Sequence, residues 1–402
     1  MGLVRCLRSY MPDVEITLLT IEISKDQKFE EKVGVKLLRH PWSGPPRKYS
    51  GVIAAFRIFL EFWRCSMYRI AGIFNKRIKK PYDQYDIFID GTLDQFNDAD
   101  SGWRSSVVGL LNIFFEWGIF RKPTATVPND IGPFTTKYTR WLARVILSRL
   151  DIVALRNKAS YEYCEQLGLN KQRIYLTGDM AFLLEPVPEQ KVKLMLQEEG
   201  VIEDLTPLIG FSANLTEMVS YSFAESMPEM ERARKYIWLM ASLINYVKHK
   251  LNGEVCIIPH DVNDIKLSLM IYEQLDNKTG VNLLRGEYLP DEIKGIISNC
   301  DIFISCRLHA AIAATSKGVP TLSIAYSAKY YRIIGEALGQ GEYIVDIRNR
   351  EPKELLVELK SKIDSLWENR DKVRLVLKER VKTVQYQAML YGKIIKELME
   401  RK

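Results

Sequence analysis

The sequence has 402 residues, 47% of them hydrophobic and 27% charged, and a formal net charge of +7. A chain of this length suits two domains of ordinary size, and its composition excludes the disordered and fibrous classes. The modest positive charge favours an anionic partner, but it does not choose among phosphorylated substrates, anionic lipid and nucleic acid.

Cysteine usage and the N-terminus point to the cytoplasm. The six cysteines are scattered and form no CxxC pair, which fits a reducing compartment. The first residues, MGLVRCLRSYMPDVEITLL, have no signal-peptide pattern, and no uncharged apolar stretch predicts a transmembrane helix. We expect a cytoplasmic protein, either free or peripheral at the inner face of the membrane. No nucleic-acid-binding pattern accompanies the charge, so we expect no nucleic-acid partner.

Residues 46–80 interleave Phe, Trp, Tyr and Ile with Arg and Lys. This pattern is typical of a helix that lies in an anionic membrane interface. A helix that packs on the core and turns its basic residues to solvent or substrate would show it too. Peripheral membrane contact through 46–80 is therefore one of two interpretations.

Strand-like and helix-like segments alternate along the chain, which favours an α/β fold with parallel sheets. The β-rich runs are 15–20, 85–90, 124–128, 151–156, 173–178, 207–213, 254–259, 281–284, 301–306 and 321–326. The helical patterns are 137–149, 158–167, 229–250, 264–276 and 290–298, followed by two polar-faced helices in the last 50 residues. We predict an N-terminal domain (1–187), a C-terminal domain (188–370) with a cleft between them, and a C-terminal helix (371–402) that packs back along both.

The stretch DIFISCRLHAAIAATSKGVPTLSIAY (301–326) reads as a strand, a small-residue helix ended by Gly318, and a second strand. Arg307 and His309 thus lie where a strand's carboxyl end meets a helix's amino end. The free N–H groups of the helix favour an anion there, Arg adds a planar fork, and His adds a titratable donor. Taken alone, the residues fit an anion clamp as well as a structural arrangement in which Arg307 pairs with a carboxylate and His309 caps the helix.

Four segments resemble a known family. CRLHAAIAATSKGVPTLSIAYSAKYYRI (306–333) resembles the signature of the polysaccharide pyruvyl transferase family. PNDIGPF and the residues after it (128–169), TGDMAFLL (177–184) and EVCIIPHDVNDIKL (254–267) resemble further elements in the family's order. The resemblance implies an α/β fold of two Rossmann-like domains with parallel sheets facing a cleft, like that of GT-B glycosyltransferases.

The resemblance also implies a transferase. Such an enzyme moves the enolpyruvyl unit of phosphoenolpyruvate onto a sugar of a surface or extracellular polysaccharide and forms a ketal. Phosphoenolpyruvate would be the donor substrate, with no other cofactor. No His/Asp/Glu cluster in the sequence has metal-ligand spacing, so we also expect no metal. The acceptor would be a saccharide or lipid-linked saccharide. Arg307, Leu308 and His309 would bind the donor.

Ketal formation needs an acid with a pKa near neutrality and a base for the incoming hydroxyl. His309 and His260, which follows the strand CIIP, are the candidate catalytic residues. Arg156, at the end of the strand DIVAL, is a further candidate anion contact. A salt bridge from Arg156 to a neighbouring helix is the alternative.

Other strand ends carry polar residues that would contact substrate. In the N-terminal domain, Asp90 and Asn129 are candidates for orienting the acceptor sugar, and Asn214 is a comparable candidate across the cleft. Ser327 and Lys329 follow a later strand and are candidates for phosphate contact, although a lysine at a helix start is commonly only a solvated charge.

Family members commonly begin with a strand and a glycine-rich turn, whereas this sequence opens inside what resembles the first helix. We therefore expect an acceptor-side domain that lacks this strand and turn. Two other functions stay open: a nucleotide-sugar glycosyltransferase of GT-B type, and a non-catalytic, membrane-peripheral member of the fold. The sequence does not predict the oligomeric state.

Overall fold

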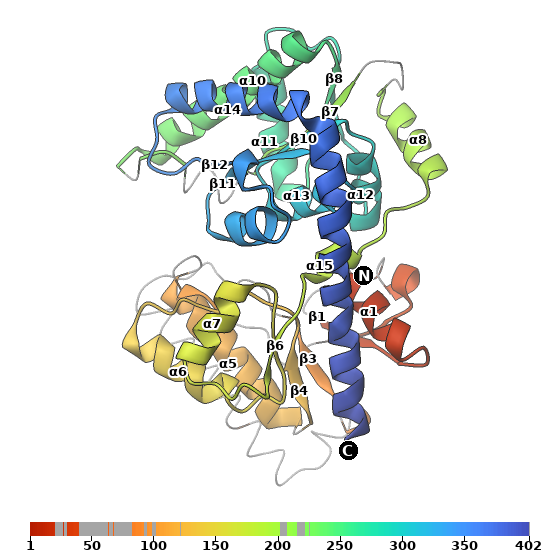
Figure 1. Ribbon diagram of the computed structural model, residues 1–402, viewed down its shortest axis with the longest axis vertical. Helices are drawn as coiled ribbons and strands as arrows, with labels where there is room; N and C mark the ends of the chain where they lie inside the picture. The colour runs from red at the N-terminus through yellow and green to blue at the C-terminus, as the bar shows by residue number, and fades with distance from the viewer. Residues whose placement is uncertain are drawn as a thin grey trace. The chain divides into compact units, whose positions relative to one another are not determined.

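A computed structural model describes residues 1–20, 27, 30–39, 63, 67, 83–91, 95–98, 102–120, 122–201, 207–214, 222–224 and 226–401. The segment 46–80 lies outside the described residues except for two positions, so its predicted membrane contact has no structural counterpart here. The chain divides into two compact units, Met1–Leu183 with Gln385–Lys402, and Leu184–Val384 (Figure 1). The sequence placed the boundary at 187/188 and treated 371–402 as a separate helix; in the structure the end of that helix belongs to the first unit.

The first unit is built from short parallel strands and the helices beside them. Strand β1 (Thr17–Thr20) pairs with β2 (Lys36–Arg39), β3 (Phe88–Asp90) with β4 (Thr124–Thr126), and β5 (Val153–Leu155) with β6 (Ile174–Leu176), all in parallel. Two single bridges, Ala125–Ile152 and Asn129–Leu155, connect β4 to β5. The helices of this unit are α1 (Gly2–Tyr10), α5 (Trp103–Phe120), α6 (Lys137–Leu147), α7 (Lys158–Gln166) and the 3₁₀ turn η2 (Met180–Leu183).

Helix α5 was not among the predicted helices. It is apolar along its length and lacks the two-faced period that marks an exposed helix. Its residues Val107, Leu110 and Ile113 are buried in one cluster with the inner face of α6. Among the helices that the structure describes, none combines the length and the apolar character needed to cross a bilayer.

The second unit is a six-stranded parallel sheet in the order β12-β11-β10-β7-β8-β9. Its strands are β7 (Leu208–Ser212), β8 (Glu254–Ile257), β9 (Val281–Leu283), β10 (Ile302–Ser305), β11 (Thr321–Ala325) and β12 (Ile344–Asp346). The chain adds β8 and β9 outward on one side of β7, then returns to the other side with β10, β11 and β12. The strand order therefore reverses between β7 and β10, and open α/β sheets bind ligands beyond the carboxyl ends of the strands at such a switch point.

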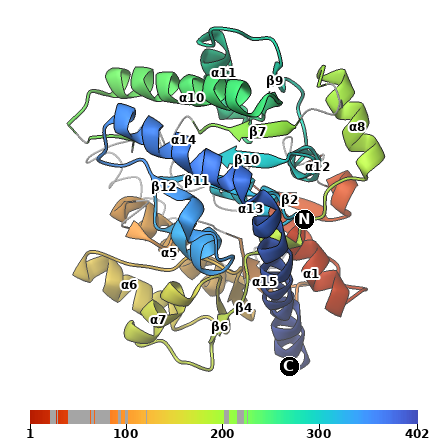
Figure 2. The same ribbon diagram turned by 45° about the horizontal axis from the view of Figure 1, so that its top comes forward.

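Helices cover both faces of this sheet (Figure 2). They are α8 (Glu189–Glu198), α10 (Glu229–Leu251), α11 (Val262–Glu273), α12 (Pro290–Ser298), α13 (Leu308–Thr315), α14 (Pro352–Glu368) and the π-helical turn η3 (Tyr331–Glu336). Helices α8, α12 and α13 share one apolar cluster with β8 and β10. On the other side, α10 packs on α14, where the Tyr246 hydroxyl donates to the Asp364 carboxylate at 2.7 Å.

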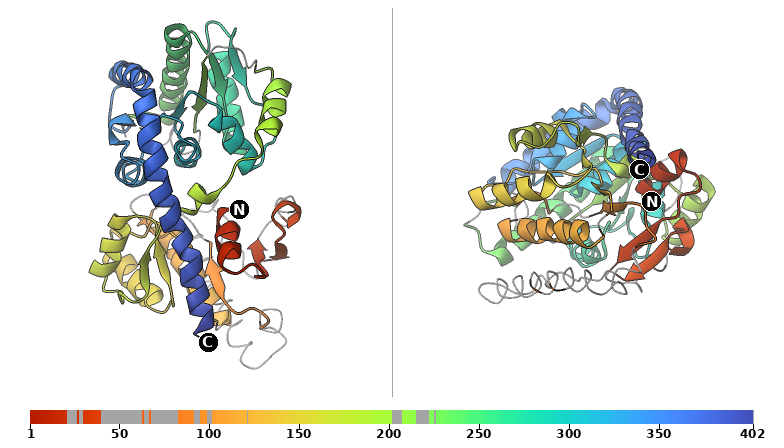
Figure 3. Two further views of the ribbon diagram at one scale, coloured as in Figure 1. Left: turned by 45° about the vertical axis from the view of Figure 1, so that its right-hand side comes forward. Right: turned by 90° about the horizontal axis from the view of Figure 1, so that it is seen from below.

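A single long helix, α15 (Arg370–Glu400), runs from the second unit into the first (Figure 3). In the second unit, Arg374 donates to the backbone oxygen of Asp301 at 3.0 Å. In the first, the buried Tyr391 hydroxyl donates to the backbone oxygen of Thr126 at 2.9 Å. The expectation that C-terminal helices pack back is confirmed.

Candidate functional site

The junction between β10 and α13 fixes the backbone around Arg307. The Ser305 hydroxyl accepts from the Arg307 N–H at 3.2 Å and donates to the Arg307 carbonyl at 2.7 Å. Arg307 is the N-cap residue of α13, and its side chain makes no capping bond. The first turn of α13 is positively polarised, as a helix start is, and such a site favours an anion. Within this turn Leu308 is buried and His309 is exposed.

The Arg307 side chain is held by a buried carboxylate. Its Nε and Nη2 atoms donate to the two carboxylate oxygens of Asp264 at 2.6 and 2.7 Å. Asp264 lies in the first turn of α11, whose N-cap Asp261 accepts from the Asn263 N–H. Sequence reasoning considered such a pairing as an alternative to anion binding. The geometry allows both, because Nη1 makes no hydrogen bond or ion pair with any residue that the structure describes.

His260 follows β8 and belongs to the same group of side chains. Its pKa is lowered from 6.5 to about 3, chiefly by burial and then by the charge effects of His309 and Arg307, which the nearby Asp261 opposes. Its Nδ1 atom is buried and has no partner among the described residues. His260 is therefore a neutral imidazole at pH 7. Its low pKa makes His260 both a poor proton donor and a weak base in the free protein.

Asn214 follows β7 and lies at the switch point. Its side chain is 1% exposed, and neither amide atom has a partner within the described ranges. Its N–H donates to the Tyr236 hydroxyl at 3.3 Å. The neighbouring ends of β7 and β10 are joined, since the Cys306 N–H donates to the Ser212 carbonyl at 2.8 Å. Asn214 thus lies at the same edge of the second unit's sheet as Arg307.

The loop after β11 lies against the end of β10. The Tyr330 hydroxyl donates to the Cys306 carbonyl at 2.8 Å, and the Tyr330 ring packs edge-on against Tyr326 at 5.6 Å between centroids. In this loop Ser327 is buried and Lys329 is half-buried. The carboxyl ends of β7, β8, β10 and β11 thus bring together seven of the predicted site residues: Asn214, His260, Arg307, Leu308, His309, Ser327 and Lys329.

The three remaining predicted residues lie in the first unit, at the ends of β3, β4 and β5. Asp90 is buried, and its carbonyl accepts from the Val127 N–H at 2.9 Å. Asn129 is buried, and its side-chain oxygen accepts from the Asp130 N–H at 2.8 Å. The Arg156 N–H donates to the Asn129 carbonyl at 3.2 Å, so the last two strand ends are adjacent.

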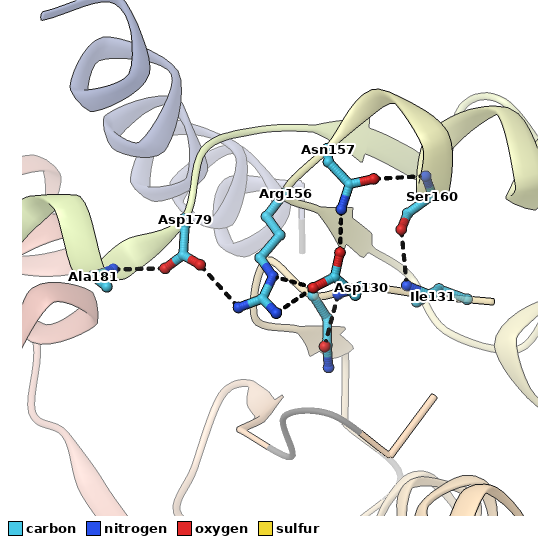
Figure 4. A network of polar contacts seen from close by, with 8 residues as sticks. Asp130, Ile131, Arg156, Asn157, Ser160, Asp179 and Ala181 are labelled. Carbon is cyan, nitrogen blue, oxygen red and sulfur yellow. Dashed lines mark hydrogen bonds and ion pairs between the residues drawn. The ribbon is translucent and has the colours of Figure 1, made fainter. Parts of the chain in front are cut away.

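Arg156 is the centre of a buried polar network (Figure 4). Its Nε donates to Asp130 at 2.7 Å, its Nη1 donates to Asp179 at 2.8 Å, and its Nη2 also contacts Asp130. Asn157 donates to Asp130 and caps α7 by accepting from the Ser160 N–H at 2.9 Å. Two carboxylates surround the guanidinium, so the structure shows a salt bridge, with acidic loop residues as the partners in place of a helix, and the anion contact at Arg156 stays a prediction.

Comparison with known proteins identifies the family. Residues 1–328 match the family model described as "Polysaccharide pyruvyl transferase". The chain belongs to this family. Amylovoran biosynthesis protein AmsJ from Erwinia amylovora is 20% identical over 266 residues, which are 65% of this chain and 63% of AmsJ. The matched region thus spans less than two thirds of that relative.

Solved structures show the fold. UDP-GlcNAc 2-epimerase from Neisseria meningitidis, bound to UDP-GlcNAc, has a TM-score of 0.62 and 12% identity, covering 100% of this chain and 96% of that one. Anabaena Alr3699/HepE in complex with UDP has a TM-score of 0.56 and 13% identity, covering 100% and 95%. At these identities the likeness establishes the fold alone, and the predicted GT-B-like α/β fold is confirmed.

In this pyruvyl transferase family member, sequence reasoning missed the residues that hold the site in place. Asp264 lies in a segment that resembles the family, and its position one turn after a histidine at a strand end was a usable signal. Asp130 and Asp179 also lie in segments that resemble the family. Tyr236 had no such signal, because it lies on α10, far from any strand end. No group of three or more potential metal ligands occurs in the part of the chain that the structure describes.

Proposed function

We propose that this chain transfers the enolpyruvyl unit of phosphoenolpyruvate to hydroxyl groups of a saccharide and forms a pyruvyl ketal during polysaccharide synthesis. The observation that carries the proposal is the grouping of Arg307, His260 and His309 around the uncapped start of α13 at the switch point. Membership of the polysaccharide pyruvyl transferase family supports it.

The donor's charges match this group. Phosphoenolpyruvate carries a carboxylate and a phosphate, so its site must supply several N–H donors. Asp264 fixes the guanidinium plane of Arg307 and leaves Nη1 to donate to the ligand. The N–H groups of the first α13 turn and the buried amide of Asn214 supply further donors. In this proposal Ser327 and Lys329 contact the phosphate.

The reaction requires one proton to be delivered and two to be removed. In the proposed sequence His309 protonates the methylene carbon of the enol, and the first sugar hydroxyl adds to the adjacent carbon. Phosphate then leaves with the electron pair of its C–O bond, and a second hydroxyl closes the ketal. His260 accepts the proton of one hydroxyl, because the negative charges of the bound donor raise its pKa, and the leaving phosphate takes up the proton of the other. Asp90 and Asn129 keep their proposed part in orienting the acceptor.

Transfer is tested by incubating the purified chain with phosphoenolpyruvate and a panel of saccharides and lipid-linked saccharides. Phosphate release and the mass of the product are then measured. We expect phosphate and pyruvylated saccharide in equal amounts, and loss of both in His309→Gln. The matched control is His249→Gln, an exposed histidine on α10, which should keep full activity. Donor binding without transfer to any acceptor would point to a non-catalytic member, and turnover of a nucleotide sugar would point to a glycosyltransferase.

A further inference from the structure

Three large aromatic side chains are exposed at the amino ends of α5 and α6. Trp103 is 50% exposed, and Tyr138 and Trp141 are each 59% exposed. The Tyr138 and Trp141 rings lie 6.4 Å apart between centroids, one helical turn from each other. Side chains of this size are normally covered, so a cluster of three needs an explanation.

The two helix starts are tied together. The Asp98 carboxylate accepts from the Thr135 N–H at 2.5 Å and from the Thr139 hydroxyl at 2.6 Å, just before and within the first turn of α6. The Asp98 carbonyl accepts from the Gly102 N–H at 3.1 Å, directly before α5 begins. Trp103 therefore lies at the same end of this helix pair as Tyr138, and α5 and α6 run side by side (Figure 3).

The exposed aromatic residues are accompanied by basic ones. The sequence from 137 to 149, KYTRWLARVILSR, has four basic residues and no acidic residue. Its inner positions, including Leu142 and Ile146, are buried in the core, while Lys137 and Arg144 are exposed. The Arg104 guanidinium lies over the Trp103 ring, 5.4 Å from its centroid. The outer face of α6 is thus aromatic and cationic.

We propose that Trp103, Arg104, Lys137, Tyr138, Trp141 and Arg144, the α5–α6 surface, dock the protein on an anionic lipid bilayer. Trp and Tyr prefer the headgroup level of a bilayer, where the ring is buried and its polar tip stays hydrated. Lys and Arg beside them gain from the negative surface potential. A sugar-stacking site would need carboxylates or amides beside the rings, and the sequence of α6 has neither.

The charge of the chain's other basic aromatic segment also favours lipid as the occupant. The sequence 46–80 contains nine Lys and Arg residues and one Glu. That segment carries the same sign as α6, so it offers no electrostatic complement to the α5–α6 surface. An anionic bilayer complements both. Docking through this surface would bring the enzyme to acceptors that are carried on lipid.

The test uses the full chain and flotation with phosphatidylcholine vesicles, with and without phosphatidylglycerol. We expect the wild type to float only with anionic vesicles. The double variant Tyr138→Ser/Trp141→Ser should abolish flotation. The double variant Lys137→Glu/Arg144→Glu should lower the partition coefficient on anionic vesicles about 30-fold or more, because each basic residue near the membrane surface contributes to partitioning. The matched controls are Tyr386→Ser, an exposed aromatic on α15, and Lys158→Glu, an exposed lysine on α7. Both controls should float like the wild type.

Two results would overturn the proposal. One is a wild-type protein that does not float with anionic vesicles, including the case in which it binds soluble polysaccharide through Tyr138 and Trp141 instead. The other is unchanged flotation of both double variants, which would assign membrane contact to another part of the chain. All changed side chains are exposed, and equal thermal unfolding of variants and wild type checks that each protein is folded.

Discussion

Replacing Arg156 by Met separates the two roles considered for this residue. Methionine keeps an apolar side chain of similar length and removes the guanidinium. If Arg156 holds the loops after β4 and β6, the change costs stability. If Arg156 binds a substrate anion, the change costs affinity for the donor and little stability.

The structure sets the magnitude. The Arg156 side chain is 2% exposed, and its two partners, Asp130 and Asp179, are 0% and 8% exposed. Removing one member of a buried ion pair costs about 3–5 kcal/mol, because a charge remains in an apolar environment without its partner. Arg156 serves two carboxylates, so we expect Arg156→Met to lower the free energy of unfolding by at least about 3 kcal/mol.

Urea denaturation measures this loss. The control is Lys158→Ala, which breaks the exposed pair Lys158–Glu162 in the next helix and should cost about 1 kcal/mol or less. Stability within about 1 kcal/mol of the wild type, together with lost phosphoenolpyruvate binding, would refute the structural role.

Three further changes probe the second unit. Asn214→Asp places a negative charge beside the proposed donor, and calorimetry should show affinity for phosphoenolpyruvate about tenfold lower or more; unchanged affinity would remove Asn214 from the site. Asp264→Asn keeps the shape of the side chain but removes one of the two oxygens that accept from the Arg307 guanidinium. KM for phosphoenolpyruvate should therefore rise about tenfold with a smaller change in kcat, and a fall in kcat alone would contradict this. The pKa of His260 is lowered to about 3, chiefly by burial and then by His309 and Arg307. Between pH 6.5 and about 3, His260 is therefore protonated in the unfolded chain and neutral in the folded chain. His260 does not lower the free energy of unfolding above pH 6.5, but it lowers that free energy as the pH falls toward 3, by about 2 kcal/mol near pH 5. Urea denaturation of His260→Gln should lack this loss. Equal acid sensitivity of variant and wild type would show that His260 titrates normally.

Much of the second unit was predictable from local sequence. Strands of a parallel sheet are buried on both faces, so they appear as continuous apolar runs such as DIFIS before Arg307. The strand–helix–strand unit at 301–326 therefore appears as expected, with Arg307 and His309 where β10 meets α13. Local patterns were sufficient because the two strands and the helix of the 301–326 segment follow one another directly in the sequence.

The remaining features depend on pairings that are distant in sequence. Asn214 lies at the same sheet edge as Arg307 because β10 returns to lie beside β7, and nothing in the residues around Asn214 encodes that order. The partner of Arg307 is 43 residues away. Arg156 looked like a ligand contact because it ends a strand, but its environment is set by acidic residues in two other loops.

The central claim is that the switch point of the second unit binds phosphoenolpyruvate through Arg307. The most direct measurement is the shift in Tm of the full chain with phosphoenolpyruvate and, separately, with UDP-glucose. We predict stabilisation by phosphoenolpyruvate of about 2.7 kcal/mol at a hundredfold excess over Kd. Arg307→Ala and Arg307→Lys should abolish this stabilisation, whereas Arg348→Ala, which breaks a more exposed Arg–Asp pair in the same unit, should keep it. Stabilisation by UDP-glucose with no response to phosphoenolpyruvate would contradict the claim.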